Sequence, residues 1–159
     1  MSKPNLINSI LIPETIVDKR ERVLLVENNA SIRQLVKQAL LAKGYKVLEA
    51  FNGKEAIRIC RNYPYKIDIL ITDMVMPVIS GVEVINEFLK IRSNSKILII
   101  SEDMKQSTLS NILLSSNAGY LEKPFSSKEL ITSLDNLFSK EGSLRQSKDE
   151  LNKDYEINQ

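Results

Sequence analysis

Polar side chains that can take part in chemistry follow short apolar runs at four places in the sequence. These places hold Glu27 with Asn28 and Asn29, Thr72 with Asp73, Ser101 with Glu102, and Lys123 before Pro124. The chain contains no histidine, which excludes Ser-His and Cys-His nucleophile pairs, histidine-based zinc sites and a phosphohistidine carrier. Any chemistry must therefore use carboxylates, hydroxyls or lysines.

Each of these residues also has an ordinary structural explanation. Asp73, which precedes Met74 and a proline, could simply start a turn, and Asn28 or Asn29 could cap a helix. Polar residues at strand ends are common. Four such positions on one edge of a sheet are harder to explain in this way, so their joint placement indicates a site.

The apolar runs predict the strands that would position these side chains. They are residues 23–26, 46–49, 67–71 and 96–100, with a short fifth candidate at 119–121. Three of the first four are nearly continuous and rich in β-branched residues, as in strands buried on both faces of a parallel sheet. The run at 46–49 alternates more, which indicates an edge strand.

Helical apolar spacing follows each predicted strand. The five stripes lie within residues 32–40, 56–60, 84–89, 109–113 and 130–138, and Gly44 is a stop signal for the first. Strands that alternate with helices predict an α/β fold with a doubly wound parallel sheet and right-handed crossovers. Ligands of such sheets bind outside the carboxyl ends of the strands, where the four polar positions fall.

The composition excludes several classes of function. The 159 residues are 43% hydrophobic and 26% charged, typical of one globular domain with some additional chain. A formal charge of +2 is far from the positive field needed for non-specific nucleic-acid binding. The single Cys60 cannot form an internal disulfide, fits a reducing cytoplasm and is expected in the core. No run approaches the roughly 20 apolar residues that span a membrane, so we expect no membrane insertion.

Over about residues 22–140 the chain resembles the receiver domain of bacterial two-component response regulators. The matching segments are 23–28, 68–77 with Gly81, 97–101 and 123–125. The resemblance implies a flavodoxin-like (βα)5 fold with strand order 2-1-3-4-5. It also implies a signalling module, not an enzyme, that a histidine kinase or histidine phosphotransfer protein phosphorylates on an aspartate. The face of the fourth helix, fifth strand and fifth helix would then bind a downstream protein.

The resemblance also implies a role for individual residues. Asp73 matches the phosphoacceptor, while Ser101 and Lys123 match the residues that contact the phosphoryl oxygens. Tyr120 matches the aromatic residue that moves together with Ser101 in the family's switch; a partly buried strand tyrosine is the alternative. The Lys123-Pro124 peptide bond matches one that is cis in the family.

The resemblance implies Mg²⁺, held by Glu27, Asn28, Asp73 and the backbone carbonyl of Val75. The family usually has a second acid where this chain has Asn28. Because an amide brings no charge, we expect weaker metal binding. Glu102 stands where a small side chain is more usual. It could obstruct an approaching phosphodonor or point outward, and we favour the outward orientation.

The leading hypothesis is a stand-alone receiver, with an N-terminal extension at 1–21, the receiver at 22–140 and a polar tail at 141–159. A fragment of a longer regulator or hybrid kinase is an equally serious reading. The second hypothesis is a receiver-like interaction module that is not phosphorylated, which Asn28 and Glu102 favour. A flavodoxin-like or nucleotide-binding enzyme is disfavoured, because no glycine-rich phosphate cradle follows the first strand.

Overall fold

The computed structural model describes residues 20–102, 112 and 117–139. All five predicted strands are present. In chain order the elements are β1 (Arg22–Val26), α1 (Ala30–Ala42), β2 (Lys46–Ala50), α2 (Gly53–Asn62), β3 (Ile69–Asp73), α3 (Gly81–Ile91), β4 (Lys96–Ser101) and β5 (Ala118–Glu122). Residues 127–139 form a further helix, which we call the C-terminal helix. The helix predicted around 109–113 lies outside the described residues except for Ile112, which is helical, as do nearly all of the two terminal extensions.

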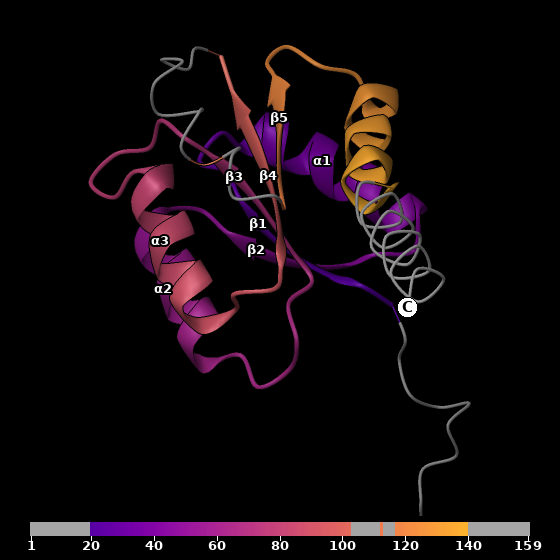
Figure 1. Cartoon of the computed structure of the whole chain (residues 1–159). Coiled ribbons are helices and arrows are strands. Elements are labelled where there is room, and N and C mark those ends of the chain that lie inside the picture. Colours follow the sequence, from indigo (N-terminus) through magenta and orange to yellow (C-terminus); the bar gives the residue numbers. More distant parts are fainter. Residues whose placement is uncertain (1–19, 103–111, 113–116, 140–159) are drawn as a thin grey trace, which may run out of the picture.

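The strands form one parallel sheet in the order β2-β1-β3-β4-β5. Helices α2 and α3 cover one face, and α1 and the C-terminal helix cover the other (Figure 1). Every residue of β3 and β4 is buried, whereas most of β2 is half-buried at the sheet edge. The predicted fold class, strand order and edge strand are therefore confirmed.

The apolar runs become strands because both faces of the sheet need apolar side chains. Leu24 and Val26 point to the layer of α2 and α3, while Val23 and Leu25 point to the layer of α1 and the C-terminal helix. Cys60 lies in the first of these layers with 2% of its surface exposed, as expected for a core thiol. No helix in the described part of the chain has the length and apolar content needed to cross a membrane.

Two glycines fix the ends of helices. Gly44 follows α1 with a φ of 86°, a conformation that residues with a Cβ rarely adopt, so it ends the helix as predicted. Gly81 begins α3 and lies against the end of β3. A Cβ on Gly81 would come within 2.7 Å of the Met74 Cα and closer still to the Asp73 carbonyl oxygen. The start of α3 is thus packed directly on the strand end that carries Asp73.

Replacing Gly81 should therefore displace this strand end. We expect Gly81→Ala to lower the free energy of unfolding by about 1–3 kcal/mol, as overpacked sites do. Gly44→Ala is the matched control. A Cβ on residue 44 meets no atom within 4 Å, so the only loss of stability comes from its positive φ, about 1 kcal/mol. Urea denaturation measures both. Unchanged stability of Gly81→Ala would contradict the close packing seen here.

Candidate functional site

The carboxyl ends of β1, β3, β4 and β5 meet around one hollow of about 340 Å³. The hollow contains every site residue predicted from the sequence except Tyr120. Its lining residues are Glu27, Asn28, Asn29, Ile32, Asp73, Val75, Ser101, Glu102 and Lys123. Side chains that are far apart in the sequence are therefore neighbours in space, as the strand-end argument predicted.

A lysine between two carboxylates forms the centre of the site. The Lys123 ammonium donates to Glu27 Oε2 at 2.7 Å and to Asp73 Oδ2 at 2.8 Å. The three side chains are at most 9% exposed. Removing the ammonium would leave two buried carboxylates facing each other without a counter-charge. We call Glu27, Asp73 and Lys123 the ion cluster.

Backbone amides occupy the remaining carboxylate oxygens of the ion cluster. The Asn29 N–H donates to Glu27 Oε1 at 2.9 Å, and the Val75 N–H donates to Asp73 Oδ1 at 3.0 Å. Each carboxylate oxygen of the cluster thus has a partner. Any new bond to Asp73 must consequently displace or share one of these contacts.

The charge state of the cluster follows from its contacts. Burial alone would lower the pKa of the Lys123 ammonium, but its hydrogen bonds to Asp73 and Glu27 outweigh burial. The pKa therefore lies above its ordinary value of 10.5. Lys123 is a cation at neutral pH.

The two asparagines after β1 have different roles. Asn29 is the N-cap of α1, and its Oδ1 accepts from the Ile32 N–H at 3.1 Å. Asn28 is exposed and lines the hollow. The capping explanation is therefore correct for Asn29, and Asn28 is the one whose side chain is available to a ligand.

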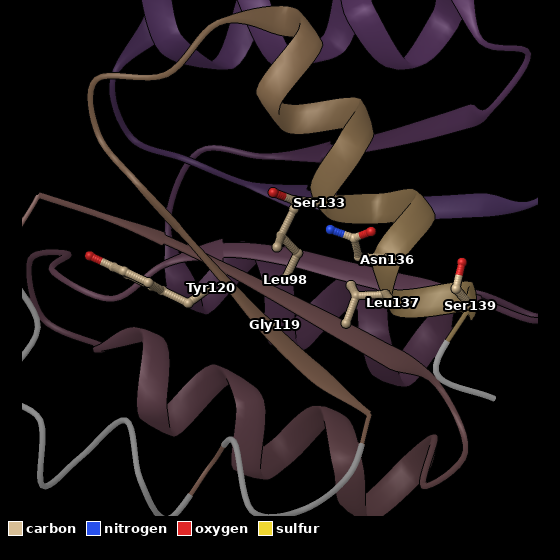
Figure 2. Close-up of a pocket in the computed structure, with 7 residues that line it drawn as sticks. All are labelled: Leu98, Gly119, Tyr120, Ser133, Asn136, Leu137 and Ser139. Carbon is tan, nitrogen blue, oxygen red and sulfur yellow. The ribbon is translucent and has the colours of Figure 1, made fainter. Parts of the chain in front are cut away.

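Ser101 and Tyr120 lie side by side at the carboxyl end of β4. Ser101 is 1% exposed and lines the hollow. The Tyr120 hydroxyl donates to the Ser101 backbone carbonyl at 3.3 Å. In Figure 2 the Tyr120 ring points away from Ser133 and Asn136 of the C-terminal helix. Tyr120 thus reaches the site through the backbone of Ser101 and not by entering the hollow.

Two further features concern the rim of the site. Glu102 is exposed at this rim. Both Glu102 and Lys123 line the hollow and also a neighbouring, more apolar pocket. The Lys123-Pro124 bond is cis, as the resemblance implied.

No motif or spacing in the sequence singles out Arg33. Its guanidinium donates from Nη1 to the Glu27 backbone carbonyl at 2.9 Å and lies 4.3 Å from the centre of the Phe51 ring. Arg33 thereby connects α1 and the end of β2 to Glu27. Arg33 Nε also lies 3.7 Å from Glu49 Oε1. The contacts that tie Arg33 to the site are a backbone carbonyl and a ring, so no spacing of charged residues could have indicated this role.

Fold and site together define a doubly wound α/β module with an ion cluster at the point where strand order reverses. A family model described as the response regulator receiver domain matches residues 23–135. The chemotaxis protein CheY of Thermotoga maritima is 31% identical over 115 residues, which are 72% of this chain and 94% of that protein. The chain therefore belongs to the response regulator receiver family.

Two other comparisons agree with this assignment. The chemotaxis protein CheY4 of Vibrio cholerae has a solved structure that matches 74% of this chain and 98% of its own, with a TM-score of 0.66 and 28% identity. The sensor kinase CckA of Brucella abortus is 33% identical over 119 residues, or 75% of this chain. This chain spans only 13% of that kinase, and 46–59% of three transcriptional regulators that it also matches.

Removing the ammonium should destabilise the fold in a pH-dependent way. We expect Lys123→Met to lower the free energy of unfolding by about 3 kcal/mol near pH 7, because two buried carboxylates lose their partner. The Lys123 pKa is higher in the folded protein than its value of about 10.5 in the unfolded chain. The ammonium therefore stabilises the fold fully when pH is below the unfolded pKa, and this stabilisation is lost once pH exceeds the folded pKa. The difference from wild type should be constant from pH 7 to about 10 and shrink at higher pH.

Urea denaturation across this pH range provides the measurement. Lys128→Met is the control, since Lys128 is exposed at the start of the C-terminal helix. A difference that grows above pH 10.5 would show that the Lys123 ammonium does not stabilise the cluster.

Proposed function

We propose that this chain accepts a phosphoryl group on Asp73 from a histidine kinase or histidine phosphotransfer protein and signals by binding another protein. The observation that supports this most is the ion cluster. It presents a carboxylate, a lysine that contacts it and the buried Ser101 around one hollow. Lys123 and backbone amides contact both carboxylates of the cluster.

The reaction follows from these groups. An Asp73 carboxylate oxygen attacks phosphorus, the P–N bond to the donor imidazole breaks, and its electron pair stays on that nitrogen. Lys123 offsets negative charge on the phosphoryl oxygens, and the Ser101 hydroxyl donates to one of them. A carboxylate is itself the nucleophile in such a step, so no general base is needed.

The donor atoms of the hollow suit Mg²⁺, which prefers oxygen ligands. Glu27, Asn28, Asp73 and the Val75 carbonyl would hold it. Bound there, the ion would neutralise charge between nucleophile and phosphoryl group. Among the described residues, no three carboxylate, thiol or imidazole ligands are grouped around one metal position. The fit is therefore one of donor chemistry, with affinity reduced by the neutral Asn28.

Restoring the missing charge should strengthen metal binding. We expect Asn28→Asp to tighten Mg²⁺ binding roughly thirtyfold, because a unit charge about 4 Å from another contributes about 1 kcal/mol even at the dielectric constant of water, and the two charges of the ion make this about 2 kcal/mol. Asn136→Asp is the matched control, as it adds the same charge to an exposed residue of the C-terminal helix that does not line this hollow. Calorimetric titration measures both, and equal affinities for Asn28→Asp and wild type would contradict this ligand set.

Phosphorylation itself has a direct test. Incubation with acetyl phosphate and Mg²⁺, followed by intact mass spectrometry, should show one phosphoryl adduct in wild type and none in Asp73→Asn. Asp135→Asn, an exposed carboxylate on the C-terminal helix, should label like wild type. Labelling of Asp73→Asn would exclude Asp73 as the acceptor. Unlabelled wild type would support the alternative, an interaction module that is not phosphorylated.

The proposed signalling surface is the fourth helix, β5 and the C-terminal helix. In the described part of this face, a hollow of about 450 Å³ lies between β5 and the C-terminal helix (Figure 2). Gly119 lines this hollow, and a Cβ on Gly119 would lie 3.0 Å from the Leu137 side chain. Tyr120 also borders this hollow, but its ring packs on the α2–α3 side of β5, where its hydroxyl contacts the Ser101 carbonyl. A change at Ser101 would therefore reach β5 through Tyr120. We also propose that the receiver comprises residues 22–140 between the two extensions. The proposed location of the protein is the cytoplasm.

A further inference from the structure

The loop between β3 and α3 contains a strained turn. Val78 has a φ of 69°, and the Ile79 N–H donates to the Pro77 carbonyl at 2.8 Å. A hydrogen bond across one residue with positive φ defines the rare, strained form of the γ-turn. Valine is among the least suitable residues for it, because its branched Cβ makes positive φ an outlier. The Val78 side chain is 98% exposed, so its own contacts do not offset the strain.

Tight packing on both sides holds this turn in place. On one side Gly81 lies against the backbone of Asp73, and its N–H donates to the Met74 carbonyl at 3.0 Å. On the other side Ile79 lies on Gly53, the first residue of α2. A Cβ on Gly53 would be 2.8 Å from the Ile79 Cβ and 3.0 Å from its carbonyl oxygen. The turn is therefore clamped between the strand end that carries Asp73 and the start of α2.

The contacts of Asp73 determine which end of the loop is disturbed first. Its Oδ1 accepts from the Val75 N–H and its Oδ2 from Lys123. Bonding of either oxygen to phosphorus changes one of these contacts. If the Val75 N–H loses Oδ1, the loop is released at the end next to Asp73 while the strain at Val78 is still present.

We propose that residues 75–79 form a strap that couples Asp73 to the amino-terminal end of α2. When Asp73 bonds to phosphorus, the Val75 N–H loses its hydrogen bond to Asp73 Oδ1. The strained turn at Val78 then relaxes, and Ile79 moves away from Gly53. This inference rests on the proposed phosphorylation of Asp73. It adds a second surface that depends on the state of Asp73, on the sheet face opposite to α1 and the C-terminal helix (Figure 1).

The surface that would change is the groove between α2 and α3. It has a volume of about 690 Å³, and Ile79 is part of its lining. Arg61 of α2 and Glu87 of α3 form an ion pair of 3.0 Å between the two helices. Lys54 and Arg58 of α2 also line the groove. Movement of Ile79 would therefore alter a charged surface, which is what a protein partner can detect.

Amide hydrogen exchange at the start of α2 tests the strap. The Glu55 N–H donates to Asn52 Oδ1 and the Ala56 N–H to the Asn52 carbonyl, so both report on the first turn. In wild type held phosphorylated by excess acetyl phosphate with Mg²⁺, we expect their exchange to accelerate at least about fivefold. The Arg92 amide at the far end of α3 serves as the reference.

Two substitutions of Val78 separate strain from side-chain contact. Val78→Gly removes the strain, so it should resist urea better than wild type, still gain the phosphoryl adduct and show less than a twofold exchange change at Glu55 and Ala56. Val78→Ala keeps a Cβ at positive φ and should respond as wild type does. Since Val78 is exposed, neither substitution removes buried packing.

The possible outcomes distinguish the strap from the proposed function. An adduct with accelerated exchange in wild type and Val78→Ala, but not in Val78→Gly, supports the strap. An adduct without accelerated exchange, or an equal response in Val78→Gly, overturns the strap and leaves phosphorylation intact. Failure of Val78→Gly to gain stability also overturns it, whatever the labelling. Wild type that gains no adduct overturns both proposals.

Discussion

The ammonium of Lys123 between the carboxylates of Glu27 and Asp73 is the interaction on which the site depends. Two nearly buried carboxylates from adjacent strands repel each other unless a cation lies between them. The sheet order brings β1 next to β3, and the loop after β5 carries Lys123 back to both. The fold and the ion cluster therefore require each other: the topology places the three charges, and the charges satisfy one another only in that topology.

This arrangement links chemistry to conformational change. A carboxylate with free oxygens could be modified without disturbing its surroundings, but both Asp73 oxygens already accept hydrogen bonds. Under the proposed chemistry, one contact leads toward Lys123 and the β5 side, and the other toward Val75 and the β3–α3 loop. The contacts that keep Asp73 in place are thus the ones through which the proposed modification would reach the surface.

Most of the fold was predictable because its signals are local. Continuous apolar runs predicted the buried strands, and the alternating run predicted β2 at the edge. The joint position of Asp73, Ser101 and Lys123 followed from the rule that parallel strands end on one side of the sheet. These features depend on side-chain type and spacing, which a sequence states directly.

The contacts that tune the site were not predictable, because backbone groups supply them. The N–H groups of Asn29 and Val75 and the carbonyl bound by Arg33 exist at nearly every residue, so no residue type marks them. At Val78 the local signal points the wrong way, since valine disfavours positive φ. The packing of Ile79 on Gly53, between segments distant in the sequence, and of Gly81 on the end of β3 accounts for the conformation there.

Asn28 has two opposite effects on the electrostatics of the hollow. Without a second acid, the charges of Glu27, Asp73 and Lys123 leave one net negative charge at the centre, which attracts a divalent cation less strongly. In the proposed reaction, the same reduction would lessen the repulsion that an anionic phosphoryl group meets as it approaches Asp73. Glu102 offsets little of this, because its charge is exposed to water and salt at the rim. In the proposed reaction, Lys123 would consequently supply a larger share of the charge neutralisation than it would beside a second acid.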